Sequence, residues 1–285
     1  MALRPAGPAR RWRPARAAAL LLAALVLTAA ACGGNGGGDG APPAPRARTA
    51  PPDHAGDRVG TLSVGSAQGP RECTASVVHS PGRNLLVTAA HCVVPDPPDP
   101  LEDLVFTPGY RNGASPYGSW PVSAMTVDPR WTEDADPEYD VAFLTVPPVG
   151  GRRIEDVVGA NALAGAGGAG QAVSVTGYPN RGEEPITCSG RTSALSPTQQ
   201  RFDCDGFVNG TSGSPWVTGA GEVVGVIGGY QEGGDTALTS YSITFDDRVT
   251  ALYRQATAAP EAGGPGTGEV TGNTKAPRST GGPSL

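Results

Sequence analysis

The fold is decided by three short segments, which read LVTAAHC at residues 86–92, YDVAFL at 139–144 and GTSGSP at 210–215. His91 ends a β-branched run, Asp140 precedes an apolar run, and Ser212 lies in a glycine-flanked turn. A serine hydroxyl becomes a good nucleophile only when a base takes its proton, and an imidazole with a pKa of about 6.5 suits that task. A carboxylate then fixes the imidazole tautomer and stabilises the imidazolium. The three segments therefore predict a catalytic triad of His91, Asp140 and Ser212.

Each segment alone also has a non-catalytic explanation. A histidine after a strand is commonly structural, an aspartate before a strand commonly caps a turn, and Gly-Ser turns are frequent in a chain with 42 glycines. Their joint occurrence in this order, with Cys92 directly after the histidine, favours the catalytic interpretation.

The sequence around these segments is typical of an all-β domain. Short β-branched or alternating runs are separated by clusters of Gly, Pro, Asn and Asp, as expected for antiparallel strands in a barrel or a sandwich. The expected strands include residues 59–64, 74–79, 85–88, 124–127, 141–146, 172–176, 223–227 and 240–245. One helix is predicted near the end, capped by Asp246, with Val249, Leu252 and Tyr253 on its apolar face.

The three segments together resemble those of the chymotrypsin-like serine peptidases. Their order His, Asp, Ser matches that template, whereas subtilisins and α/β-hydrolases have other orders, and Ser214 breaks the Gly-x-Ser-x-Gly pattern of the hydrolases. The serine segment, in which Ser214 follows Gly213, is most similar to that of the bacterial branch that includes the V8-like glutamyl endopeptidases. The resemblance covers residues 58–257 and implies two six-stranded antiparallel β-barrels with a C-terminal helix. Its expected boundaries are about 58–150 for barrel one, about 168–245 for barrel two and 246–257 for the helix.

The resemblance also implies the remaining parts of the site. The oxyanion hole would use the backbone N–H groups of Gly210 and Ser212. Cys92 would pair with Cys73, which leaves Cys188 to pair with Cys204. Thr211 stands where many animal relatives have an aspartate that pairs with a freshly cut N-terminus, so that activation switch is expected to be absent.

The substrate pocket implied by the resemblance has two walls without charge. Its expected residues are Gly206, Phe207 and Val208 on one wall and Gly228, Gly229 and Tyr230 on the other. Burying an unpaired charge among them would cost several kcal/mol, so an uncharged, small to medium apolar substrate side chain is expected. Asp205 is the alternative, because a shift of one residue in the loop would point its carboxylate into the pocket. The strand 224–230 lacks the histidine on which glutamyl relatives rely.

The two ends of the chain are unsuited to a folded core. Residues 1–31 have the basic, apolar and small-residue order of an export signal, and Cys32 after Ala31 resembles a bacterial lipoprotein signal. We expect a lipid on Cys32 that holds the protein at the outer face of the cell membrane; cleavage after Ala31 and free secretion are the alternative. Residues 32–57 are expected to form a disordered Gly/Pro-rich tether, and 258–285 a disordered tail.

Composition excludes several other functions. The net charge is −6 with no basic stripe after residue 58, which argues against a nucleic-acid partner. Four cysteines beyond Cys32 in an exported chain favour disulfides over metal ligation, so no metal and no cofactor are expected. We expect a monomer that acts on protein or peptide substrates, as a serine endopeptidase. A surface binding lipoprotein with little or no activity and a structural wall protein are the alternatives.

Overall fold

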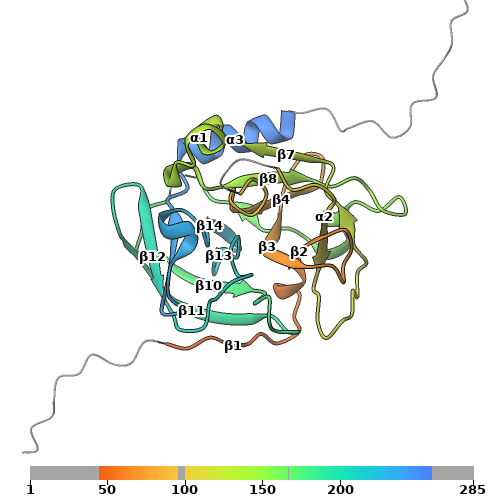
Figure 1. Ribbon diagram of the computed structural model, residues 1–285, viewed down its shortest axis with the longest axis horizontal. Coiled ribbons are helices and arrows are strands. Elements are labelled where there is room, and N and C mark those ends of the chain that lie inside the picture. Colours follow the sequence, from red (N-terminus) through yellow and green to blue (C-terminus); the bar gives the residue numbers. More distant parts are fainter. Residues whose placement is uncertain (1–44, 96–99, 166, 259–285) are drawn as a thin grey trace, which may run out of the picture. The chain divides into compact units, whose positions relative to one another are not determined.

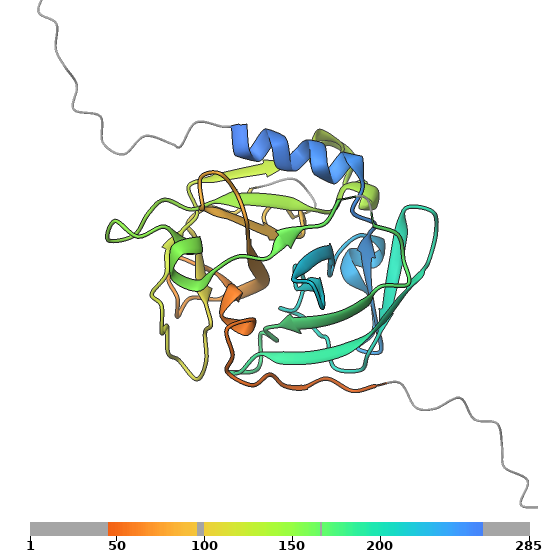
Figure 2. The same cartoon turned by 180° about the vertical axis from the view of Figure 1, so that it is seen from behind.

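The computed structural model describes residues 45–95, 100–165 and 167–258, and their strands form two sheets (Figures 1 and 2). The expected export signal, the lipidation site at Cys32 and the C-terminal tail from residue 259 onward lie outside the described residues. None of the helices in the described part of the chain has the length and apolar character needed to cross a membrane.

The first sheet is antiparallel throughout and has the strand order β6-β5-β2-β3-β4-β8-β7. After β6, the N–H of Val122 donates to Leu104 O of β5, and the N–H of Ser123 donates to Thr145 O of β8. This short segment therefore connects β5 with β8, which are not neighbours in the strand order. The strands are β2 (Val59–Val64), β3 (Arg71–Val78), β4 (Leu85–Thr88), β5 (Leu104–Pro108), β6 (Trp120–Pro121), β7 (Ala124–Val127) and β8 (Ala142–Thr145).

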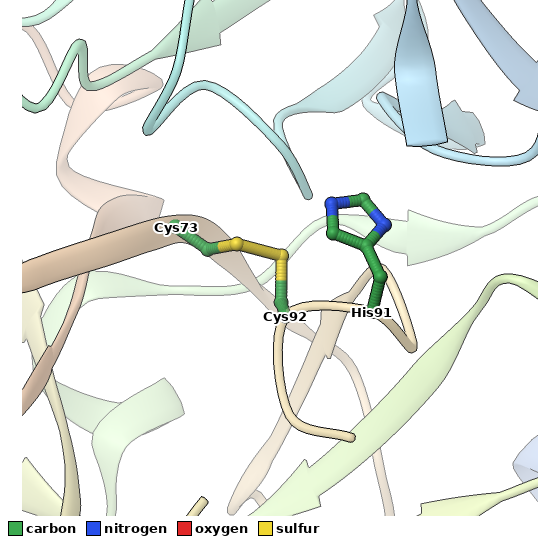
Figure 3. A group of neighbouring side chains, drawn as sticks. All are labelled: Cys73, His91 and Cys92. Atoms are coloured by element: carbon green, nitrogen blue, oxygen red, sulfur yellow. A yellow bond between two sulfur atoms is a disulfide. The ribbon is translucent and has the colours of Figure 1, made fainter. Parts of the chain in front are cut away.

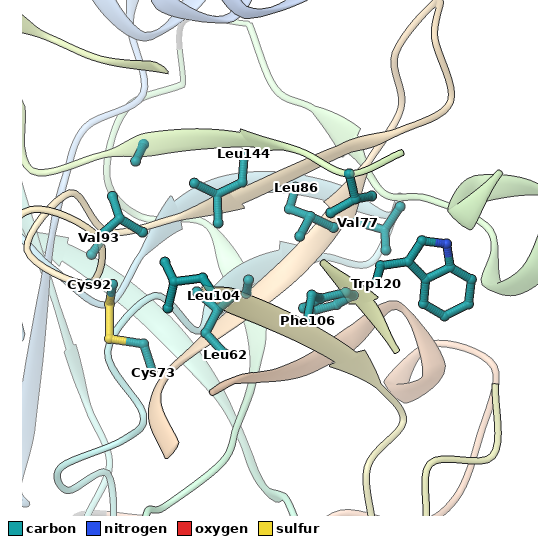
Figure 4. Packing of buried hydrophobic residues seen from close by; sticks show 14 of the residues in the cluster. Leu62, Cys73, Val77, Leu86, Cys92, Val93, Leu104, Phe106, Trp120 and Leu144 are labelled. Carbon is teal, nitrogen blue, oxygen red and sulfur yellow. A yellow bond between two sulfur atoms is a disulfide. The ribbon is translucent and has the colours of Figure 1, made fainter. Parts of the chain in front are cut away.

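The alternation of side chains along β3 explains how one strand serves two cores. Cys73, Ala75 and Val77 point into the core of the first sheet, which is filled by large apolar residues such as Phe106 and Trp120 (Figure 4). The intervening Thr74, Ser76 and Val78 are also buried, but they face the second half of the domain. The same strand therefore carries polar residues inside the protein.

The second sheet has the order β15-β12-β11-β10-β13-β14-β9, with β1 added to β11. All of its pairs are antiparallel except β14 with β9. Beyond β14, the N–H of Gly228 donates to Tyr241 O of β15, which links the far sides of this sheet. The strands are β1 (Arg48–Thr49), β9 (Ala162–Leu163), β10 (Ala172–Gly177), β11 (Ile186–Ala194), β12 (Gln199–Asp203), β13 (Pro215–Thr218), β14 (Glu222–Val226) and β15 (Thr239–Ile243).

The C-terminal helix α3 (Asp247–Ala258) covers the place where the two sheets meet. Asp246 caps it by accepting hydrogen bonds from the N–H groups of Arg248 at 2.8 Å and Val249 at 3.4 Å. Val249 and Leu252 are buried in an apolar cluster to which strands of both sheets contribute. The remaining helices are short: α1 (Pro129–Asp134), α2 (Ile154–Val158), η1 (Gly56–Arg58), η2 (Pro137–Tyr139) and η3 (Tyr230–Gly233).

The structure confirms the expected all-β class with two six-stranded units and a terminal helix. Each sheet has six strands of four or more residues, and the two-residue strands β1, β6 and β9 extend them. The expected disordered tether, in contrast, is wrong for residues 45–57, because this segment contains β1 and the first two residues of η1, and its Ala50 is buried. The residues of the segment are held mainly through their backbone groups, which a Pro- and Arg-rich composition does not reveal.

Candidate active site

His91 and Asp140 leave the first sheet from the same end. β4 and β8 are antiparallel neighbours, with Thr88 opposite Ala142. His91 lies three residues after Thr88, and Asp140 lies two residues before Ala142. Strand pairing therefore brings together two residues that are 49 positions apart in sequence.

The Asp140 carboxylate is fully buried and accepts three hydrogen bonds. Its Oδ2 accepts from His91 Nδ1 at 2.8 Å and from the Gly229 N–H at 2.7 Å, while its Oδ1 accepts from the His91 N–H at 2.9 Å. The His91 side chain is 10% exposed and that of Asp140 is 0% exposed. Because Nδ1 carries the proton that Asp140 accepts, the neutral ring presents the lone pair of Nε2, which is the arrangement a general base requires.

The charges around His91 favour its protonated form. Burial lowers the pKa of His91, but the charge and hydrogen bond of Asp140 and the charge of Glu232 raise it, and the net shift is above the ordinary 6.5. For Asp140, burial raises the pKa, but the charge and hydrogen bonds of His91 lower it below its ordinary value. The pair is therefore arranged to stabilise an imidazolium next to a carboxylate.

The turn that contains Ser212 is bound to the first sheet through Thr74. The Thr74 N–H donates to Ser212 O at 2.8 Å, and the Thr74 hydroxyl donates to Gly210 O at 2.9 Å. The hydroxyl also accepts from the Tyr178 N–H at 2.9 Å. Thr74 precedes no sequence motif, and its role depends on contacts more than 100 residues away, so sequence reasoning missed it.

Two glycines are required for the turn to fit there. Gly213 has φ +79°, and a Cβ atom at this position would lie 2.1 Å from Thr74 O. Gly210 has φ +94°, and a Cβ atom there would lie 2.4 Å from Asn180 N. Both positions combine a left-handed backbone with a close backbone approach, which only glycine tolerates.

Some backbone N–H groups of this turn donate hydrogen bonds within the chain, and two do not. The N–H groups of Thr211, Gly213 and Ser214 donate to Val208 O, Ile227 O and Thr211 O, respectively. Within the described residues, neither Gly210 N–H nor Ser212 N–H donates to another group of the chain. These two donors are the pair expected for an oxyanion hole.

The Ser212 side chain is half-buried, and no hydrogen bond joins its hydroxyl to another residue that the structure describes.

A disulfide lies directly beside the histidine (Figure 3). Cys73 is bonded to Cys92, and Cys188 to Cys204, which are the pairs that the resemblance implies. A ring nitrogen of His91 and the sulfurs of Cys73 and Cys92 lie within 4.8 Å of one another. Because the two sulfurs are bonded to each other, they offer no thiolates for a metal, and the group connects the histidine loop to β3 instead.

A pocket of about 380 Å³ opens next to Ser212. Phe207 and Val208 line it, as expected, whereas Gly206, Gly228, Gly229 and Tyr230 are not among its lining residues. Its lining also includes Ser212, Asn209, Thr211, Ile227, Gln231, Glu232, Gly233, Gly234, Asp235, Thr236, Ala237 and Ser240.

Two acidic residues that line this pocket, Glu232 and Asp235, were missed by sequence reasoning. They come after the expected wall in the sequence and line the pocket because the chain reverses its direction there. Gly229 bends the chain at φ +77°, and Gln231 and Glu232 continue the bend in the left-handed region, both at φ +51°. The glycine pairs at 228–229 and 233–234 are the sequence signal for this reversal. Asp205 does not line the pocket; its carboxylate pairs with Arg46 at 2.7 Å.

The comparisons with known proteins agree with this geometry. Residues 73–226 match the model of the trypsin-like peptidase domain. The chain belongs to this family. The peptidase domain so identified contains all three predicted triad residues, and the chain is a trypsin-like serine peptidase with the chymotrypsin-like fold.

Solved structures support the same assignment. The protease Anisep from Arthrobacter nicotinovorans is 26% identical with a TM-score of 0.64, covering 71% of this chain and 96% of its own. The thermostable serine protease AL20 from an extremophilic microorganism is 24% identical with a TM-score of 0.65, covering 73% and 100%. A Glu endopeptidase shares the fold at 16% identity, with a TM-score of 0.64 and coverage of 75% and 98%. No curated protein shows significant sequence similarity to the chain.

Proposed function

We propose that the chain is an exported serine endopeptidase that hydrolyses peptide bonds through an acyl-enzyme on Ser212. The observation that carries the proposal is the pair of unused N–H groups at Gly210 and Ser212, in a turn held against the sheet that supplies the His91–Asp140 pair. Such donors stabilise the negative charge that develops on a carbonyl oxygen during acyl transfer.

The proposed reaction proceeds in two halves. Ser212 Oγ attacks the carbonyl carbon while its proton passes to His91 Nε2, and the resulting oxyanion accepts hydrogen bonds from the N–H groups of Gly210 and Ser212. His91 then gives the proton to the leaving nitrogen, and the C–N bond breaks to leave an ester on Ser212. Water attacks this ester with His91 as base, and return of the proton to Ser212 Oγ releases the acid product. Asp140 holds the ring and stabilises the imidazolium in both halves.

The pocket suggests a substrate class that differs from the sequence expectation. The six residues expected there carry no charge, but the described residues that line the pocket next to Ser212 include the acidic Glu232 and Asp235 and no lysine, arginine or histidine. An anionic substrate side chain would be repelled, while an Arg or Lys side chain would find opposite charge. We therefore propose a preference for a cationic side chain on the acyl side of the cleaved bond.

Two measurements test this function. Digestion of unfolded casein by the full chain, followed by mass spectrometry, should give internal fragments, and the Ser212→Ala variant should give none. Release of terminal residues alone would contradict endopeptidase activity.

In a peptide panel that varies only the side chain before the cut, Arg or Lys should exceed Glu at least about tenfold in kcat/KM, since 1.4 kcal/mol is a factor of ten. A preference for Glu or for Val would contradict the proposed pocket chemistry.

The proposed location rests on the sequence and on the two disulfides, which form in oxidising compartments outside the cytosol. A diacylglyceryl group on Cys32 would hold the enzyme at the outer membrane face. Mass spectrometry of the mature N-terminus should show this group in the membrane fraction. An unmodified N-terminal peptide from the culture medium would instead establish free secretion.

A further inference from the structure

We infer that residues 45–47, here called the N-terminal strap, position one wall of the substrate pocket by holding Asp205. The inference rests on the proposed function for its consequence in catalysis. The strap leads into β1, which runs beside β11 of the second sheet (Figure 1). It lies at the start of the described chain, about 160 residues before Asp205, which it contacts.

The strap binds Asp205 through all of the polar groups of that residue. The Asp205 N–H donates to Pro45 O at 2.8 Å, and Asp205 O accepts from the Ala47 N–H at 2.7 Å. The Asp205 carboxylate pairs with Arg46 at 2.7 Å. Because the Arg46 side chain is 80% exposed, this ion pair contributes little, and the two backbone hydrogen bonds carry most of the interaction.

The path from the strap to the pocket is short. Ala47 packs against the apolar cluster of the second sheet that contains Phe207, and Phe207 lines the pocket. Between them, Gly206 has φ +125°, and a Cβ atom there would lie 3.0 Å from Ala47 Cβ. On its other side, the Gly206 N–H donates at 2.8 Å to the carbonyl of Ala237, a second lining residue. The pocket wall is thus held between the strap and the chain at Ala237.

The chain that follows the strap is attached at a different place. Arg48 and Thr49 pair with β11, and the Ala50 N–H donates to Pro185 O at 2.8 Å. Pro185 and Ala50 are not among the residues that line the pocket next to Ser212. The attachment at Ala50 therefore provides an internal control for the strap, with a hydrogen bond of the same kind that does not reach the pocket.

This arrangement has a consequence for processing. Loss of the strap would leave the N–H and carbonyl groups of Asp205 without partners, at a cost typical of unpaired polar groups. Removal of residues 45–47 should consequently weaken substrate binding, which is the opposite of activation by removal of a propeptide. The mature enzyme should keep these residues.

The test compares Ala47→Pro with Ala50→Pro in the full chain. Each substitution removes one N–H donor of a backbone hydrogen bond. Ala47→Pro should raise KM for a peptide with Arg before the cut by about 5–30-fold, the factor that corresponds to one or two kcal/mol. Its kcat should stay close to that of the wild type, as should the rate of fluorophosphonate labelling. Ala50→Pro should leave KM near the wild-type value, even if it lowers the unfolding temperature equally.

Hydrogen exchange supplies a readout that does not depend on activity. Exchange of the amides at residues 205–208 should accelerate in Ala47→Pro and not in Ala50→Pro. If Ala47→Pro does not fold, Ala47→Gly is compared with Ala50→Gly, because each removes one methyl group and adds backbone freedom, and only the former should increase KM and accelerate exchange at residues 205–208. Equal effects of the paired variants, or unchanged exchange at residues 205–208, would overturn the inference. A wild-type enzyme that fluorophosphonate does not label would contradict the proposed function, while the exchange result would still decide the role of the strap.

Discussion

At the scale of single residues, we expect His91 to determine how activity responds to pH. The base must be neutral, and its pKa lies above the ordinary 6.5 because the effects of Asp140 and Glu232 exceed the opposing effect of burial. We therefore predict that kcat/KM falls as the pH decreases through a value above 6.5 and reaches a plateau on the alkaline side. The measurement is a pH profile with a peptide that has no charged side chain.

The contribution of Glu232 to this pKa can be removed separately. Glu232→Gln deletes a negative charge that favours the imidazolium, so the acid limb of the profile should move to lower pH. Glu222→Gln is the matched control, since Glu222 is exposed at the start of β14 and is not among the groups that shift the pKa of His91. An acid limb that stays in place in Glu232→Gln, or moves equally in both variants, would contradict this account of the His91 environment.

Thr74 is the second residue with a predicted effect. Thr74→Val keeps the shape but removes the hydroxyl that bonds Gly210 O and accepts the Tyr178 N–H. Leaving such groups unpaired in the interior costs about 1–3 kcal/mol, so kcat/KM should fall roughly tenfold or more as the Ser212 turn loosens. Thr74→Ser retains the hydroxyl and should restore most of the activity. Equal activity of the two variants would show that the hydroxyl does not position the turn.

At the scale of secondary-structure elements, α3 stabilises the junction of the two sheets. Leu252 is 6% exposed and packs in the cluster shared by both sheets. Leu252→Ala should lower the free energy of unfolding by about 2–5 kcal/mol, the usual range for a buried leucine. Arg254→Ala, on the exposed side of the same helix, should change it by less than about 0.5 kcal/mol. Urea denaturation of both variants measures the difference, and a small loss for Leu252→Ala would show that the helix is peripheral.

The elements that sequence could predict are those with a local signal. The α3 helix was predicted with its Asp246 cap, because a capping residue and an apolar stripe lie within eight positions of each other. Eight strands were predicted from their β-branched or alternating runs, whereas β5, β11, β12 and β13 were not predicted. The His91 and Asp140 segments were found as motifs, and the pairing of β4 with β8 explains why the two residues meet.

The elements that sequence could not predict depend on non-local backbone contacts. The segment 45–57 has a composition typical of a linker, yet its backbone N–H and C=O groups pair with β11 and Asp205. Glu232 and Asp235 line the pocket because glycines and left-handed residues reverse the chain after β14. Neither feature produces a periodic pattern in the sequence, so each can be identified only when the distant residues that it contacts are known.

At the scale of the whole domain, the site belongs to neither sheet alone. The first sheet supplies His91 and Asp140, and the second supplies Ser212 on the loop before β13. Thr74 of the first sheet holds the Ser212 turn, while the N-terminal strap holds the loop that leads into it. Catalysis is therefore expected to require that both halves of the domain are correctly paired.

The central claim is that Ser212, activated by His91, is the nucleophile. Its most direct test is labelling of the full chain with a fluorophosphonate, followed by peptide mapping of the modified residue. The account predicts one label, on Ser212, that is lost in Ser212→Ala and kept in Ser214→Ala. With a peptide substrate, Ser212→Ala should lower kcat by about six orders of magnitude, the scale measured for such triads. An unlabelled wild-type protein, or a label on Ser214, would contradict the account.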